Sequence, residues 1–212
     1  MKREEITAAG KWRYATKKFD QTAQLNEKDY QTIKEAIRLA PTSYGLQPFK
    51  VIEVTSNATR EALKEVGFGQ AQLTDSSRLL AFAPLNNFGP DLIERYFTLV
   101  KEARGVTDDQ IGGYKSFMQQ VFSTWSEEQK ANWSDKQAYI ALGFAMQTAA
   151  LLQIDTCAIE GVDMDAATKI LGLEDTEYRV TAFLAIGHRA AADGTQQAAK
   201  VRVSEDVLFE TI

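Results

Sequence analysis

Residues 138–154, AYIALGFAMQTAALLQI, are the stretch of the 212-residue chain that most restricts its fold. The stretch is shorter than a bilayer span, and Gln147, Thr148 and Gln153 interrupt it, so it indicates a buried core helix rather than a membrane-spanning one. Its apolar residues fall on nearly every face of a helix, and such a helix must be covered on all sides. We therefore expect the other elements of the chain to pack around it.

The spacing of apolar residues and the turn signals predict a mixture of helices and strands, with helix in excess. Pro41 ends one helix and Gly67–Gly69 another, and Ser126 or Ser134 begins the long helix. The expected helices are 1–9, 26–40, 57–65, 90–104, 107–122, the long helix and 165–171, and the expected strands are 49–55, 79–85, 156–160 and 179–187. This order indicates a single domain, 1–212, of the α+β or α/β class.

The last segment, VRVSEDVLFETI at residues 201–212, has a different character. Val201 and Val203 alternate with polar residues, but the segment holds too few apolar residues to build a core of its own. We expect it to pack on another surface, for example that of a second subunit.

Composition makes several classes of function improbable. The formal net charge of −5 gives no bulk attraction to nucleic acid. His188 and Cys157 are the only residues of their kinds, so a His/Cys metal site is not expected. The sequence has neither the dinucleotide fingerprint nor the P-loop. The lone cysteine and the polar N-terminus predict a cytoplasmic location.

Two basic clusters are candidates for binding an anion. In KWRYATKK, Arg13 and Lys17 are four residues apart and would share one face of a helical turn. Lys200 and Arg202 are two residues apart and would share one side of an extended segment. A guanidinium with an ammonium suits a phosphate, although each cluster taken alone is more often solvated surface.

Three other segments carry more polar groups or glycine than a simple connection requires. They are the loop PTSYGLQP at 41–48, the turn GQAQ at 69–72 and the strand end CAIEG at 157–161. A connection needs only a few residues of turn chemistry, so the first of these is oversupplied with hydrogen-bonding groups.

Seven motifs then occur in order along the chain. They are RYATKKFD, APTSYGLQPFKV, GQAQ, KQAYIALG, AIEGVD, LAIGHR and KVR. Each is weak alone, but together, over the full length, they resemble the FMN-dependent nitroreductase family of the oxygen-insensitive NAD(P)H nitroreductase and quinone reductase type.

The resemblance implies an α+β fold with a mostly antiparallel central sheet flanked by helices. It also implies a homodimer in which the C-terminal strand of each subunit completes the sheet of the other, and in which two FMN molecules lie at the interface. The polar loop at 41–48 would then contact the flavin across the interface, and the tail, which has too few apolar residues for a core, would pack on the second subunit.

The resemblance also implies a set of cofactor-binding residues. They are Arg13, Tyr14, Ala15, Lys17, Pro41, Thr42, Ser43, Gly45, Gln70, Gln72, Gln137, Ala158, Ile159, Glu160, Gly161, Lys200 and Arg202. Arg13, Lys200 and Arg202 would hold the FMN phosphate. Lys17, at the pyrimidine edge of the ring, and Glu160, through its backbone N–H near flavin N5, would take part in catalysis.

The substrate pocket would be lined by Tyr44, Phe68 and Phe117, although Tyr44 is equally typical of an ordinary turn. Gln137 would contact the flavin across the dimer, or would instead form a capping box with Ser134. Three positions depart from the pattern of relatives: Ala15 stands where serine is common, Gly45 where some relatives carry asparagine, and Gln72 where some relatives have lysine.

The expected activity is two-electron transfer from NADH or NADPH to nitroaromatics, quinones or related small acceptors by a ping-pong mechanism. One alternative is a specialised flavoenzyme of the same fold, such as a reductive dehalogenase or a flavin-fragmenting enzyme. Another is a protein of a different class, either a flavin- or anion-binding module without turnover or a nucleic-acid binder with a basic patch. The leading interpretation includes no nucleic-acid, membrane or metal partner.

Overall fold

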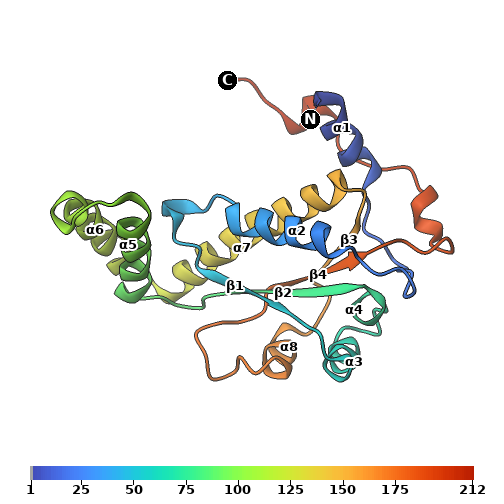
Figure 1. Cartoon of the computed structure of the whole chain (residues 1–212), viewed down its shortest axis with the longest axis horizontal. Helices are drawn as coiled ribbons and strands as arrows, with labels where there is room; N and C mark the ends of the chain where they lie inside the picture. The colour runs from blue at the N-terminus through green and yellow to red at the C-terminus, as the bar shows by residue number, and fades with distance from the viewer. Residues whose placement is uncertain (1) are drawn as a thin grey trace.

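The computed structural model describes residues 2–212 and contains one sheet with helices around it (Figure 1). Met1, at the start of the expected helix 1–9, lies outside the described residues. The helices are α1 (Arg3–Trp12), α2 (Glu27–Leu39), α3 (Asn57–Val66), α4 (Gln72–Asp75), α5 (Pro90–Arg104), α6 (Asp108–Ser123), α7 (Glu127–Leu151), α8 (Met164–Ile170) and α9 (Glu205–Leu208). The strands are β1 (Phe49–Glu53), β2 (Arg78–Pro84), β3 (Asp155–Ile159) and β4 (Ala182–Gly187).

The four strands form one sheet in the order β1-β2-β4-β3. All three pairings are antiparallel, with Val51 opposite Phe82, Leu80 opposite Leu184 and Cys157 opposite Ala185. This confirms the α+β class and the antiparallel sheet. Each strand that was expected is present, but β4 begins at Ala182 rather than at 179, and the short helix α4 was not expected.

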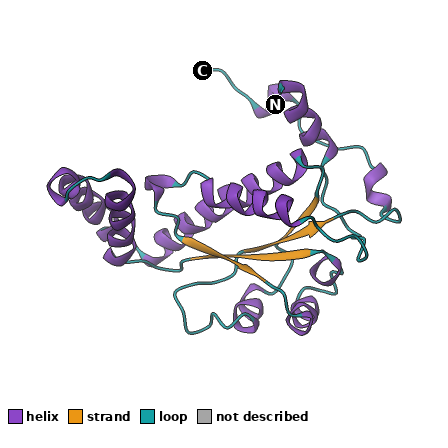
Figure 2. Ribbon diagram, in the orientation of Figure 1, coloured by secondary structure: helices purple, strands orange, loops and turns teal. Residues whose placement is uncertain are grey.

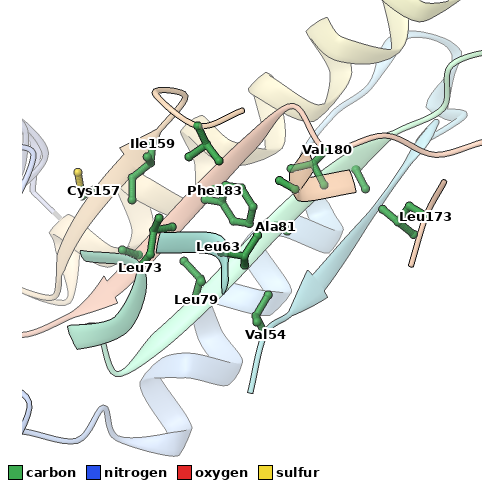
Figure 3. Packing of buried hydrophobic residues seen from close by; sticks show 14 of the residues in the cluster. Val54, Leu63, Leu73, Leu79, Ala81, Cys157, Ile159, Leu173, Val180 and Phe183 are labelled. Atoms are coloured by element: carbon green, nitrogen blue, oxygen red, sulfur yellow. The ribbon is translucent and has the colours of Figure 1, made fainter. Parts of the chain in front are cut away.

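Helices cover both faces of the sheet (Figure 2). Leu79, Ala81 and Ala83 of β2 point toward α3 and α8, because successive side chains of a strand alternate between faces. Figure 3 shows this layer, in which Phe183 and Leu63 are fully buried. Leu80 and Phe82 point to the other face, where small residues of α7 let that helix pack closely. A third apolar cluster joins α5 and α6 beyond the end of the sheet.

The long helix α7 begins at Ser126, whose side chain accepts from the N–H of Gln129 in a capping box. The alternative start at Ser134 is wrong, because that residue lies inside the helix and is buried. Within one chain α7 is not covered on all sides, since Ile140 is 39% exposed and Phe144 is 44% exposed. In residues 2–212 there is no helix with both the length and the apolar character needed to cross a membrane.

An ion pair joins Arg189, which follows β4, to the buried carboxylate of Asp155 in β3. Asp155, at the start of β3, accepts from the backbone N–H of Arg189 (2.9 Å) and from its Nε (2.8 Å). The guanidinium of Arg189 also lies over the rings of Trp12 and Tyr14, at 4.2 and 4.6 Å from their centroids. Chain segments at residues 12–14, 155 and 189 are therefore fixed to one another.

A second buried carboxylate, Asp193, holds the residues that follow. Its Oδ2 accepts from the backbone N–H groups of Lys17 (2.8 Å) and Lys18 (3.1 Å) and from the hydroxyl of Tyr14 (2.9 Å). Its Oδ1 accepts from the N–H of Thr195 (2.9 Å). Burial opposes ionisation, but these donors outweigh it and hold the pKa of Asp193 at about 2.

The first prediction concerns this carboxylate. Asp193→Ala leaves the partly buried N–H groups of Lys17, Lys18 and Thr195 without their acceptor, so the free energy of unfolding at pH 7 should fall by about 1–3 kcal/mol. Because the folded pKa lies below the ordinary 3.8, the carboxylate stabilises the fold above pH 3.8, and this contribution is lost as the pH falls toward 2. The difference between wild type and variant in urea unfolding should therefore shrink over that range.

Glu174→Ala, which removes an exposed loop carboxylate that makes no hydrogen bond in the described chain, serves as the control and should leave the unfolding curve unchanged. A difference between wild type and Asp193→Ala that stays constant from pH 7 to pH 2 would contradict this assignment.

Candidate functional site

Residues 13–18 form an extended segment beside β3. Arg13 ends α1 with extended backbone angles, so the helical turn expected to align Arg13 with Lys17 is wrong. Ala15 instead forms a parallel bridge with Thr156, and the N–H of Thr16 donates to the carbonyl of Thr156 (3.3 Å). Lys17 lies at a bend of the chain, but its charge and that of Arg13 both act on the thiol of Cys157, so the two cations still lie on the same side of the segment.

Three cations gather at this segment without an acidic partner. The Nε of Arg13 is buried and donates to no atom of residues 2–212. Burial lowers the pKa of Arg13, and the charge of Arg202 lowers it further. Burial likewise lowers the pKa of Lys200, as do Arg13 and Arg202. In the described chain none of the three makes a salt bridge, so the cluster has the electrostatics of an anion site.

The buried thiol of Cys157 lies where several of the expected residues meet. Burial raises the pKa of Cys157, while the charge of Lys17, a hydrogen bond with Gln72 and the charge of Arg13 act in the opposite sense. Lys17, Gln72 and Arg13 therefore lie near one point of β3. Cys157 itself was not expected to mark the site, because a single buried cysteine carries no motif.

The exit of β3 presents two backbone donors. The N–H groups of Glu160 and Gly161 donate to no other residue of the described chain, whereas the N–H of Val162 donates to the carbonyl of Glu160 (2.7 Å). Beside this turn, Nε2 of Gln70 donates to the carbonyl of Gly161 (2.6 Å). Two adjacent free donors suit a ligand that offers hydrogen-bond acceptors at its edge.

The loop at residues 41–47 contains strained backbone. Tyr44 and Gly45 both have positive φ, at 57° and 74°, in the short helical turn Ser43–Gly45. The amide oxygen of Gln137 accepts from the N–H of Ser43 (2.8 Å), and its nitrogen donates to the carbonyl of Trp133 (3.0 Å). The side chain of Gln137 is therefore committed within the subunit. Its capping role is wrong because Ser134 does not begin the helix.

The expected site residues thus form two groups on different sides of α7. Gln137 holds the 41–47 loop, while the hydroxyl of Tyr139 donates to the carbonyl of Thr181 (3.5 Å). Burial, and after it the nearby carboxylate of Glu160 at the β3 exit, raises the pKa of Tyr139 to about 12. At about 100° per residue, side chains two positions apart on a helix point in nearly opposite directions. One chain therefore does not bring the 41–47 loop to the β3 exit.

The expected substrate-pocket aromatics are also divided. Phe68 is 82% exposed, has a φ of 56° and lies in the turn before Gln70. Phe117 is exposed on α6 and stacks with Tyr114 at 6.3 Å between ring centroids. Tyr44 contacts Phe122 edge to face at 5.4 Å. Among residues 2–212 no group of three or more metal-ligating side chains is close enough to hold a metal ion.

Comparison with known proteins agrees with the motifs. A family model described as "Nitroreductase family" matches residues 11–188. The chain is 35% identical over 215 residues to a Staphylococcus epidermidis protein provisionally named as an NAD(P)H nitroreductase, covering 98% of this chain and 96% of that protein. It is 30% identical to a similarly named protein of Staphylococcus saprophyticus, covering 97% and 95%.

Solved structures share the fold at lower identity. A nitroreductase of provisional assignment from Bacillus subtilis superposes with a TM-score of 0.88 at 20% identity, covering 100% of both chains. A similarly assigned nitroreductase from Exiguobacterium sibiricum, solved in complex with FMN, gives 0.83 at 19% identity and covers 100% of this chain and 98% of its own. The family model and the curated relatives span nearly the whole chain, and the chain therefore belongs to the nitroreductase family.

Proposed function

We propose that the protein binds FMN and transfers two electrons from NADH or NADPH to nitroaromatics, quinones or related small acceptors. The observation that carries this proposal is the cation cluster of Arg13, Lys200 and Arg202, with a buried Arg13 nitrogen that has no partner in the described chain. A like-charged cluster around a buried guanidinium nitrogen is unfavourable unless an anion neutralises it, and the phosphate of FMN is such an anion.

The rest of the β3 side fits a flavin ring. The free N–H groups of Glu160 and Gly161 would donate to N5 and O4 of the ring. The exposed ammonium of Lys17 would face the pyrimidine edge, and Gln72 would lie near it. A neutral glutamine at 72 supplies a hydrogen bond but no charge, so Lys17 alone would stabilise negative charge at this edge.

FMN supplies the chemistry, because it accepts two electrons from a nicotinamide and passes them to an acceptor. The residues of the chain bind and orient. Arg13, Lys200 and Arg202 would fix the phosphate, and the two backbone donors would set the plane of the ring. The exposed ring of Phe68 would cover one side of a cleft that donor and acceptor enter in turn.

We propose further that the protein works as a homodimer. Ile140 and Phe144 give α7 an apolar outer face, and Val207, Leu208 and Phe209 of the tail are exposed within one chain. The 41–47 loop and the β3 exit of one chain lie on different sides of α7. In a dimer, the 41–47 loop of the second subunit would reach the flavin held at the β3 exit of the first. The strand expected from the tail for the partner's sheet stays a prediction, since within one chain the tail holds only the short helix α9.

The next prediction tests the phosphate site. Arg13→Ala and Arg202→Ala each remove a charge-assisted contact, so FMN affinity should fall about tenfold to a hundredfold, since such contacts contribute roughly 1.5–3 kcal/mol. Fluorescence titration of the apoprotein measures this. Riboflavin lacks the phosphate, so it should bind wild type weakly and be insensitive to both changes. Arg104→Ala, on the exposed end of α5, is the control. Equal affinity of wild type for FMN and riboflavin would refute the assignment.

A further prediction concerns turnover. If donor and acceptor share one cleft, they cannot bind together, and double-reciprocal plots should give parallel lines. Lys17→Ala should lower the flavin midpoint potential and slow reduction by NADH or NADPH in the FMN-saturated variant, because it removes the only cation at the pyrimidine edge. Stopped-flow absorbance measures the rate. Intersecting lines would contradict the shared cleft, and an unchanged potential and rate would remove Lys17 from catalysis.

The dimer has its own test. Phe144→Glu places a charge on the outer face of α7 and should convert the protein to monomers that retain little FMN, as measured by light scattering and flavin absorbance. Leu99→Glu, at a comparably exposed leucine of α5, should leave the mass and flavin content unchanged. A Phe144→Glu monomer saturated with FMN would show that each subunit binds flavin by itself.

A further inference from the structure

The turn that carries Phe68 is unusually constrained. Phe68 and Gly69 have φ of 56° and 73°, so two successive residues adopt the left-handed conformation that glycine tolerates and phenylalanine resists. The N–H of Gly69 donates back to the carbonyl of Lys64 (2.9 Å), which ends α3. The backbone thus accepts strain at Phe68 while leaving its ring in solvent, and strain of this kind persists only where surrounding contacts hold it.

The same turn contacts the segment that follows β3. The N–H of Asp163 donates to the carbonyl of Val66 (3.0 Å). At Gly67 a side chain would not fit, because a Cβ there would lie 2.9 Å from the carbonyl oxygen of Leu63. Two turns far apart in sequence, at 66–70 and 160–163, are therefore in direct contact.

One side chain bridges the two turns. Nε2 of Gln70 donates to the carbonyl of Gly67 (3.1 Å) in its own turn and to the carbonyl of Gly161 (2.6 Å) in the other. Both amide hydrogens are thereby used, and only Oε1 remains for any other partner. A residue that the family resemblance assigns to direct flavin contact is instead occupied inside the protein.

The bridge acts on the Gly161 N–H, one of the two free donors. The Gly161 carbonyl is fixed by Gln70, which sets the peptide plane shared by Gly161 and Val162. The Val162 N–H in that plane donates to the Glu160 carbonyl (2.7 Å), and this carbonyl shares its own peptide plane with the Gly161 N–H. The direction of the Gly161 N–H is therefore set through two linked peptide planes, whereas a flexible turn with the same sequence would present this donor in many directions and lose its orienting effect.

From these contacts we propose that Gln70 is a positioning residue for the reduction step, in which its side-chain amide clamps the Phe68 turn to the β3 exit and thereby orients the Gly161 N–H toward the flavin. The proposal deepens the proposed function and rests on it only for the identity of the ligand. It differs from a direct flavin contact, because the clamp is formed by the protein alone and exists before any ligand binds.

The test uses Gln70→Glu, which keeps the size of the side chain but replaces both donors with acceptors. Hydrogen exchange is measured first on the apoprotein. The amides of Val162 and Asp163 should exchange about tenfold faster or more, because loss of the clamp lowers the free energy of local opening. In the FMN-saturated variant, reduction by NADH or NADPH should also slow by about tenfold, with saturating FMN excluding a simple loss of affinity.

Gln21→Glu makes the same chemical change at an exposed turn whose side chain makes no hydrogen bond in the described chain, and it should alter neither quantity. Gln70→Leu repeats the loss of donors without a charge and covers the case in which the glutamate variant folds poorly. Unchanged exchange at residues 162–163 in both Gln70 variants would overturn the clamp, and if FMN affinity fell in those same variants, Gln70 would be a direct ligand. Because exchange is measured without flavin, a failure of wild type to bind FMN would leave this result standing.

Discussion

The buried carboxylates of Asp155 and Asp193 hold the segment on which the site depends. Asp155 pairs with Arg189, and Asp193 accepts from the backbone of Lys17 and Lys18. A buried carboxylate is stable only when donors surround it, and here the donors come from chain segments far apart in sequence. Because both carboxylates already have donors from other residues, Arg13 is left without an acidic partner and is free to bind an external anion.

Different interactions stabilise the sheet and form the candidate site. The sheet is apolar on both faces, and small residues of α7 allow close packing, so burial of apolar surface determines the fold. The site lies in turns at the edge strand β3, where backbone donors and unpaired cations remain exposed. If the 41–47 loop and the β3 exit both bind flavin, as proposed, a chain that separates them and leaves an apolar face on α7 is incomplete as a single subunit. The proposal therefore links assembly to cofactor binding.

The sequence predicted the elements well where periodicity or a turn residue was strong. Helix α5 was predicted to the residue, since Pro90 begins it and Gly105 ends it in the left-handed conformation. The sequence analysis wrongly placed Arg13 and Lys17 in a helical turn, because the bridge between Ala15 and Thr156 is a tertiary contact that leaves no signal in the local sequence. The roles of Asp193 and Gln70 could not be predicted for the same reason, as their partners lie up to 179 residues away.

The central claim is that this chain holds a flavin that a nicotinamide reduces. The visible spectrum of the purified full-length protein, incubated with FMN and freed of excess, tests it most directly. We predict a bound-flavin absorption band at about 450 nm, a wavelength set by the cofactor itself. In the absence of oxygen, one equivalent of NADH or NADPH per flavin should bleach this band. A protein that retains no flavin, or whose flavin band neither nucleotide bleaches, would contradict the claim.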